Sequence, residues 1–208
     1  AMKLDKDFRW VEFRLDPRAR FHDGHPIEFE DIEFTFNAIK NEASLGWKTS
    51  YRDIVSLEQT GPRSFKFHFS ERAPKTPQLA RHISMFWVLP KHYWQGRKFH
   101  ATTLDIPLGQ GPYRIKSVDP GKKVVYERVK DYWAADLPVN RGYYNLDTIE
   151  YVYYLDKNVV VEAHKAGEFD FRYENDAKSW MTMYDFDGAV RDLFVKDRRP
   201  LKLPWGIP

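Results

Sequence analysis

The sequence feature that most constrains the fold is the strict alternation of phenylalanine with polar residues over positions 64–69. Successive side chains of a strand point to opposite faces, so this alternation predicts a strand with one buried face. The same pattern over residues 11–15 predicts a second half-buried strand, and residues 55–57 are the expected neighbour of the first. We therefore expect a sheet in the first third of the chain.

Helical spacing appears between these strands. Ile32, Phe36 and Ile39 recur at intervals of about one turn, which predicts an amphipathic helix over residues 28–40. Acidic residues fall in its first turn, where the helix dipole favours negative charge. Prolines introduce a second, shorter helix over residues 78–83.

The second half of the chain has the same mixture of elements. Residues 113–116 and 124–129 predict two antiparallel strands joined by the turn 119–121. A strand over residues 148–155 and a short helix ending at Gly167 follow. Strands and helices in both halves indicate an α/β (α+β) chain with mixed sheets and flanking helices.

Composition narrows the classes of function. The chain has 33 Lys and Arg against 30 Asp and Glu, and a net charge of +3 over 208 residues is too small to indicate nucleic acid or an anionic membrane as partner. It has no cysteine, which excludes disulfides, thiolate metal sites and a cysteine nucleophile. No apolar stretch approaches the roughly 20 residues that span a bilayer. The length fits one large domain or two small ones.

Sites for metals and cofactors have little support. His22, Asp23 and His25 surround a predicted turn and are of types that bind metal ions, but a polar turn collects such residues by composition alone. Residues 108–112 lack the lysine and hydroxyl of a phosphate-binding loop, and the sequence has no Gly-x-Ser-x-Gly motif. We therefore predict no metal, no cofactor and no catalytic residue.

Two other functions stay open. Two carboxylates in an aromatic cleft are enough for a carbohydrate-active hydrolase, and 16% of the residues are aromatic. The acids at predicted helix starts and turns are Glu30, Asp31, Asp105, Asp119, Asp131 and Asp147. Their positions have an ordinary structural explanation, so the enzyme ranks below a binding protein. A stand-alone interaction module is the third candidate.

Several blocks, in a fixed order, resemble one known family. Residues 13–36, with the turn Phe-His-Asp-Gly-His-Pro and an acidic helix start, are similar to the signature of the family 5 extracellular solute-binding proteins. Blocks that resemble later parts of the family are residues 109–113, 131–133, 146–149 and 166–170. The stretches 136–142 and 171–175 are most similar to its YejA-type branch.

The resemblance implies a periplasmic receptor, not an enzyme, that binds oligopeptides and presents them to the permease of an ABC importer. It also implies a periplasmic binding protein type II-like fold with three lobes. On this basis we expect residues 8–105 to form the second (extra) lobe and 106–172 part of the returning first lobe. Residues 173–208 are then an extended tail that starts the third lobe.

Members of this family are much longer than this chain. We therefore expect a fragment, natural or engineered, that lacks the lobe completing the ligand cleft and binds peptide weakly or not at all. Its exposed lobe faces favour self-association. If peptide binds, the resemblance points to second-lobe residues near the cleft. These are Trp47, Tyr51, Met85 and Trp87.

Overall fold

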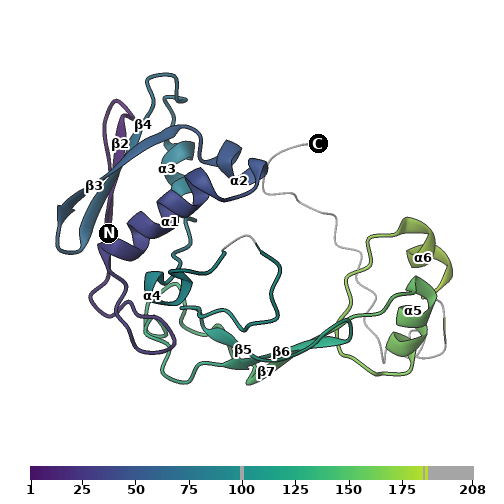
Figure 1. Ribbon diagram of the computed structural model, residues 1–208. Coiled ribbons are helices and arrows are strands. Elements are labelled where there is room, and N and C mark those ends of the chain that lie inside the picture. Colours follow the sequence, from purple (N-terminus) through teal and green to yellow (C-terminus); the bar gives the residue numbers. More distant parts are fainter. Residues whose placement is uncertain (99–100, 185, 187–208) are drawn as a thin grey trace. The chain divides into compact units, whose positions relative to one another are not determined.

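The computed structural model describes residues 1–98, 101–184 and 186. Contacts divide the chain into two compact units, residues 1–152 and 153–208. Both sheets belong to the first unit, so the predicted mixed α/β class with flanking helices is confirmed (Figure 1). Among the described residues, none of the helices combines the length and the apolar content that crossing a bilayer requires.

The first sheet has four antiparallel strands in the order β1-β2-β4-β3. These are β1 (Met2–Leu4), β2 (Trp10–Arg14), β3 (Ile54–Gly61) and β4 (Ser64–Phe69). Phe65, Phe67 and Phe69 are all buried, which confirms the predicted half-buried strand. The expected pairing of β3 with β4 is also confirmed, whereas β1 was not predicted, because three residues are too few for a periodic pattern.

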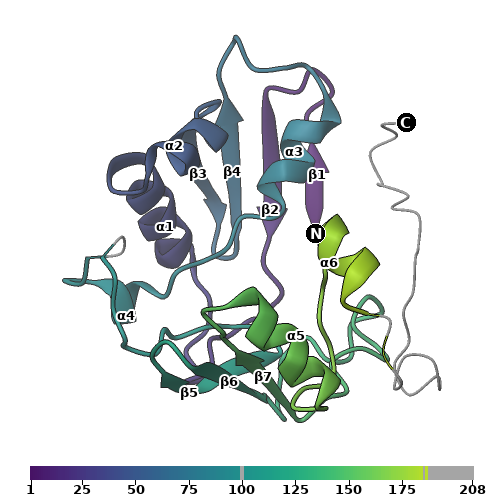
Figure 2. The same cartoon turned by 90° about the vertical axis from the view of Figure 1, so that its right-hand side faces the viewer.

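Four helices accompany this sheet, and Figure 2 shows α1, α2 and α3 beside its strands. They are α1 (Phe29–Asn41), α2 (Leu45–Ser50), α3 (Pro77–Ile83) and α4 (Lys91–Trp94). Ile32 and Ile39 of α1 and Ile83 of α3 join Phe67 in one buried apolar cluster. The predicted helices α1 and α3 are therefore confirmed. Helices α2 and α4 have only six and four residues, too few for a repeat of apolar side chains, so the sequence does not predict them.

Polar side chains of α1 hold a distant segment of the chain. Thr35 is fully buried, and its hydroxyl donates to the Asp31 carbonyl at 2.7 Å and accepts the Leu89 N–H at 2.8 Å. The Asp31 carboxylate, 6% exposed, accepts the N–H of Glu28 at 3.0 Å and of Lys91 at 2.8 Å. These bonds satisfy buried N–H groups that would otherwise be costly.

The second sheet has three antiparallel strands in the order β5-β6-β7. They are β5 (Tyr113–Asp119), β6 (Lys123–Arg128) and β7 (Thr148–Val152). Gly121 in the β5–β6 turn has φ +75°, a backbone conformation that glycine adopts without strain. The predicted hairpin is confirmed, and β7 is shorter than the predicted strand over residues 148–155.

The second unit contains α5 (Lys157–Lys165) and α6 (Ala177–Thr182). Asp156 and Asp176 cap them, since each side chain accepts N–H groups of the first helical turn. Gly167 has φ +76° just after α5, as predicted for a residue that ends a helix. Helix α6 was not predicted. The assignment of residue ranges to lobes stays a prediction, and most of the predicted tail lies outside the described residues.

The buried Thr35 hydroxyl gives a test of this packing. Thr35→Val keeps the shape of the side chain but leaves the Leu89 N–H without its acceptor, so we expect a loss of about 1–3 kcal/mol in the free energy of unfolding. The matched control is Thr60→Val, which removes an exposed hydroxyl from β3 and should change the free energy by less than about 0.5 kcal/mol. Urea unfolding followed by circular dichroism measures both, and equal effects would contradict the assignment.

Candidate functional site

The structure brings three of the four predicted ligand contacts together. Trp47 in α2 lies edge-on to Trp87, with 4.9 Å between ring centroids, and its plane is nearly parallel to that of Tyr51 at 6.3 Å. Trp47 is 40% exposed and Met85, two residues before Trp87, is 73% exposed, whereas Tyr51 is 3% exposed. Trp47 and Met85 are thus available to a ligand, whereas the buried Tyr51 packs against the ring of Trp47.

Tyr51 is held by several neighbours. Its ring lies 5.2 Å from His82 and 5.8 Å from Phe86, measured between centroids. The Lys40 ammonium donates to the Tyr51 carbonyl at 3.0 Å. Burial raises the pKa of the Tyr51 hydroxyl and lowers the pKa of Lys40. These contacts therefore hold Tyr51 in place within the aromatic cluster. Whether the cluster contacts a ligand stays a prediction.

A mostly apolar groove of about 620 Å³ lies beside this cluster, along the inner face of the first sheet. Its apolar lining includes Phe13, Phe65, Phe67, Phe86, Val88 and Trp133. The indole Nε1 of Trp133 is buried and has no hydrogen-bond partner among the described residues. An apolar groove of this kind suits a ligand with apolar side chains.

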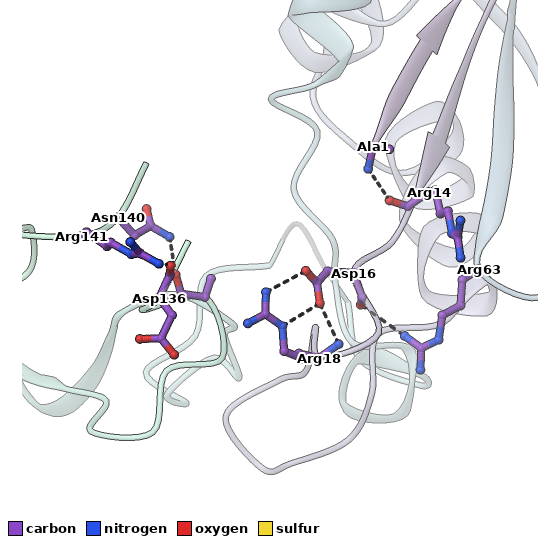
Figure 3. Close-up of polar contacts among 9 residues, drawn as sticks. Ala1, Arg14, Asp16, Arg18, Arg63, Asp136, Asn140 and Arg141 are labelled. Carbon is purple, nitrogen blue, oxygen red and sulfur yellow. Dashed lines mark hydrogen bonds and ion pairs between the residues drawn. The ribbon is translucent and has the colours of Figure 1, made fainter. Parts of the chain in front are cut away.

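Asp16 lines the groove, and Figure 3 draws its polar contacts. The Arg18 guanidinium donates to both oxygens of Asp16 at 3.0 Å, and Arg63 donates to the Asp16 carbonyl at 3.3 Å. The bonds from the Arg18 side chain, and then its backbone N–H, lower the pKa of Asp16 to about 2. Asp16 is therefore a fixed negative charge at the entrance.

A second pocket, of about 290 Å³, is lined by tyrosines that the sequence analysis did not select as site residues. Tyr144 contacts Tyr132 at 6.1 Å and Tyr143 at 6.2 Å between ring centroids, and has φ +59°. Figure 3 shows part of the loop that carries it, where Asn140 donates to the Ala134 carbonyl at 2.8 Å. The only sequence signal was the density of tyrosines around a turn-rich stretch.

Five of the six acids considered for a two-carboxylate enzyme have structural partners, and Glu30 lies in the first turn of α1. Asp31 binds backbone N–H groups, as described above. The ion pairs of the others are Asp105 with Arg97, Asp119 with Lys122, Asp131 with Arg20, and Asp147 with Arg128. These contacts agree with the ordinary structural explanation of these acids.

His22 forms hydrogen bonds with the backbone of residues 109–111. Its N–H donates to the Gly109 carbonyl at 2.9 Å, and its ring Nε2 lies 2.8 Å from the Gly111 carbonyl. A Cβ at position 109 would come within 3.0 Å of the His22 ring, which explains the glycine there. His25 and Asp23 instead lie with His92, from α4.

The chain matches one family and its members. The model of the bacterial extracellular solute-binding proteins, family 5 Middle, matches residues 2–200. The uncharacterized protein YejA of Escherichia coli (strain K12) is 43% identical over 195 residues, which are 93% of this chain and 31% of that protein. The probable peptide-binding protein YejA of Agrobacterium fabrum (strain C58) is 35% identical over 201 residues, or 93% of this chain and 32% of that protein. The chain spans about a third of the length of these curated relatives.

Solved structures share the fold. The oligopeptide-binding protein AppA of Bacillus subtilis, in complex with a nonapeptide, superposes with a TM-score of 0.69 at 21% identity, covering 90% of this chain and 36% of that chain. At this identity the likeness concerns the fold alone. The predicted periplasmic binding protein type II-like fold is therefore confirmed.

The charge on the groove rim predicts a pH dependence. Because the pKa of Asp16 is about 2 in the folded chain against a usual 3.8, its contribution to stability is present above about pH 4 and is lost as the pH falls towards 2. We expect Asp16→Asn to be less stable than the wild type at about pH 6, with the gap closing near pH 2. Urea midpoints at several pH values measure this.

The cause of the shift can be tested separately. In an Arg18→Gln background the Asp16 carboxylate loses its strongest partner, so Asp16→Asn should then have little effect at neutral pH. A gap between Asp16→Asn and the wild type that stays constant from neutral to acid pH would contradict the assignment.

Proposed function

The chain belongs to the bacterial extracellular solute-binding proteins of family 5, and from this membership we propose that it forms part of the oligopeptide-binding receptor of an ABC importer. The receptor works in the periplasm, presents peptides to the importer's permease and carries out no reaction. The observation that carries this proposal is the match of the family model over residues 2–200.

Peptide, rather than another solute, is supported by related proteins and by the surface of this chain. One relative is described as a probable peptide-binding protein, and one protein of the same fold was solved with a nonapeptide. Trp47 and Met85 offer exposed aromatic and thioether surface, which adapts to side chains of different shape.

This chain alone binds peptide weakly in our proposal. Residues 8–105 provide the second lobe, 106–172 part of the first lobe and 173–208 the start of the third, so a peptide is covered on one side only. A half-covered ligand buries too little surface to offset the loss of its freedom. The dissociation constant should therefore be weaker than about 100 μM.

Calorimetric titration with short peptides up to about 10 mM tests the function and the contacts together. We expect saturable, weak binding that Trp47→Phe and Met85→Ala each weaken by at least about threefold, because both remove exposed contact area. The matched control is Trp10→Phe, since Trp10 lies in β2 with its ring 4.7 Å from the Lys66 ammonium and is not a proposed contact.

Each other outcome of that titration has a definite meaning. Absence of binding at about 10 mM would agree with the expectation that the chain binds peptide weakly or not at all without the further lobe. Equal effects of Trp10→Phe and Trp47→Phe would contradict the placement of the ligand contacts. A dissociation constant below about 100 μM would contradict the need for further lobes. In separate assays, turnover of a glycoside would favour the hydrolase, and co-purification of a stable protein partner would favour the interaction module.

Self-association is the second part of the proposal, and β7 supports it. The strand is an edge of the second sheet, so its outer backbone groups have no partner strand among the described residues. Tyr151 and Val152 on this strand are exposed, and Tyr153 and Leu155 directly after it are exposed as well. An apolar edge strand is a template for pairing with a second copy.

We expect a concentration-dependent dimer by native mass spectrometry. Val152→Lys places a charge on the edge and should raise the dimer dissociation constant at least about tenfold. Val139→Lys is the control, because Val139 is also exposed, at 75% against 41% for Val152, but lies in a loop. A strictly monomeric wild type, or an equal effect of the control, would refute the proposed interface.

A further inference from the structure

Three metal-binding side chains from two distant segments meet on the first unit. Asp23 and His25 belong to the turn between β2 and α1, and His92 belongs to α4. Asp23 Oδ2 lies 2.7 Å from His92 Nε2 and 3.2 Å from His25 Nδ1. The two imidazole rings stack with 4.3 Å between centroids. One carboxylate oxygen and two imidazole nitrogens thus converge on one point.

The turn that carries two of these groups is rigidly built. The His25 N–H donates to Asp23 Oδ1 at 3.1 Å, which leaves Oδ2 facing the imidazoles. Gly24 has φ +91° and its N–H donates to the Phe21 carbonyl at 3.0 Å. Phe21 in turn donates to the His25 carbonyl at 2.9 Å. The backbone of the turn and the Asp23 carboxylate are therefore held in place before any ion binds.

His92 is fixed from another direction. The N–H of Lys91, its neighbour, donates to the buried Asp31 carboxylate at 2.8 Å. The His92 ring also meets the buried Phe21 ring edge-on at 5.8 Å between centroids. Because the core holds α4 in this way, the approach of His92 to Asp23 does not depend on a flexible side chain alone. Preorganised ligands lower the cost of binding an ion.

We propose that Asp23, His25 and His92 form a binding site for a divalent transition-metal ion of the zinc, nickel or copper type. Imidazole nitrogen together with one carboxylate suits these ions better than magnesium or calcium, which prefer oxygen ligands. The three ligand atoms lie within 4.8 Å of one another. One ion at about 2.1 Å from each can therefore be bound once the stacked imidazole rings turn about their side-chain bonds so that their nitrogens face it.

Three protein ligands leave at least one coordination position open. A four-coordinate ion completes its shell with water or with a donor from another molecule. His25 is well exposed and the other two side chains are about a third exposed, so the open position faces solvent. This departs from the sequence-based expectation of no metal, which considered His22 in place of His92. His22 is held by the backbone of residues 109–111.

The purified chain, without a histidine tag, is titrated with Zn²⁺ and, separately, Ni²⁺ in competition with a coloured chelator. We expect one ion per chain, and binding weakened at least about tenfold in His92→Ala and in His25→Ala. The matched control is His68→Ala, because His68 pairs with the Glu58 carboxylate at 2.6 Å but has no second imidazole in its cluster. It should bind as the wild type does.

A second readout separates loss of the site from loss of the fold. The ion should raise the unfolding temperature of the wild type and of His68→Ala but not of His92→Ala. Histidine ring signals in NMR spectra should shift at His25 and His92 and stay unchanged at His68. Binding that survives both His25→Ala and His92→Ala, or that His68→Ala abolishes, would overturn the proposal.

Discussion

One buried carboxylate holds much of the first unit in place. Asp31 accepts N–H groups from the start of its own helix and from Lys91, sixty positions later in the chain. Together with the Thr35 hydroxyl, it fixes residues 89–91 against α1. Trp87 lies just before this attachment and His92 just after it. The aromatic cluster, the edge of the apolar groove and the proposed metal ligand therefore share one anchor, and it is polar rather than apolar.

Regular spacing made part of this fold predictable. Strands β2 and β4, helix α1 and the β5–β6 hairpin repeat apolar side chains often enough to be read from the sequence. Helices α2 and α4, of six and four residues, do not complete such a repeat, although they carry Trp47 and His92. The site was predictable only in part for the same reason. Trp47, Tyr51 and Trp87 could be selected as aromatic residues near the predicted cleft. The burial of Tyr51, however, depends on its contacts with His82 and Phe86. The contact of Asp23 with His92 joins residues far apart in the chain and so leaves no local pattern in the sequence.

The groove and the histidine cluster are separate surfaces of one unit. The residues that line the groove do not include Asp23, His25 or His92. A metal ion would therefore not compete with a peptide for space. It would instead join α4 to the turn before α1, two segments that Asp31 already connects through the backbone. In the proposed receptor, such an ion would act on the proposed peptide-binding surface by stiffening the segments that support it.

Helix α2, which carries Trp47, is held less firmly than α1, which has a capping box and five buried residues. It has no side-chain cap at its first turn and none of its six residues is buried. Segments with few buried contacts open locally at a small fraction of the free energy of global unfolding. Amide hydrogens of α2 therefore exchange with solvent sooner than those of α1, and the indole of Trp47 can change its height above Tyr51 without disturbing the sheet. If the chain binds peptides as proposed, this freedom would let Trp47 adjust to different side chains while the core stays unchanged.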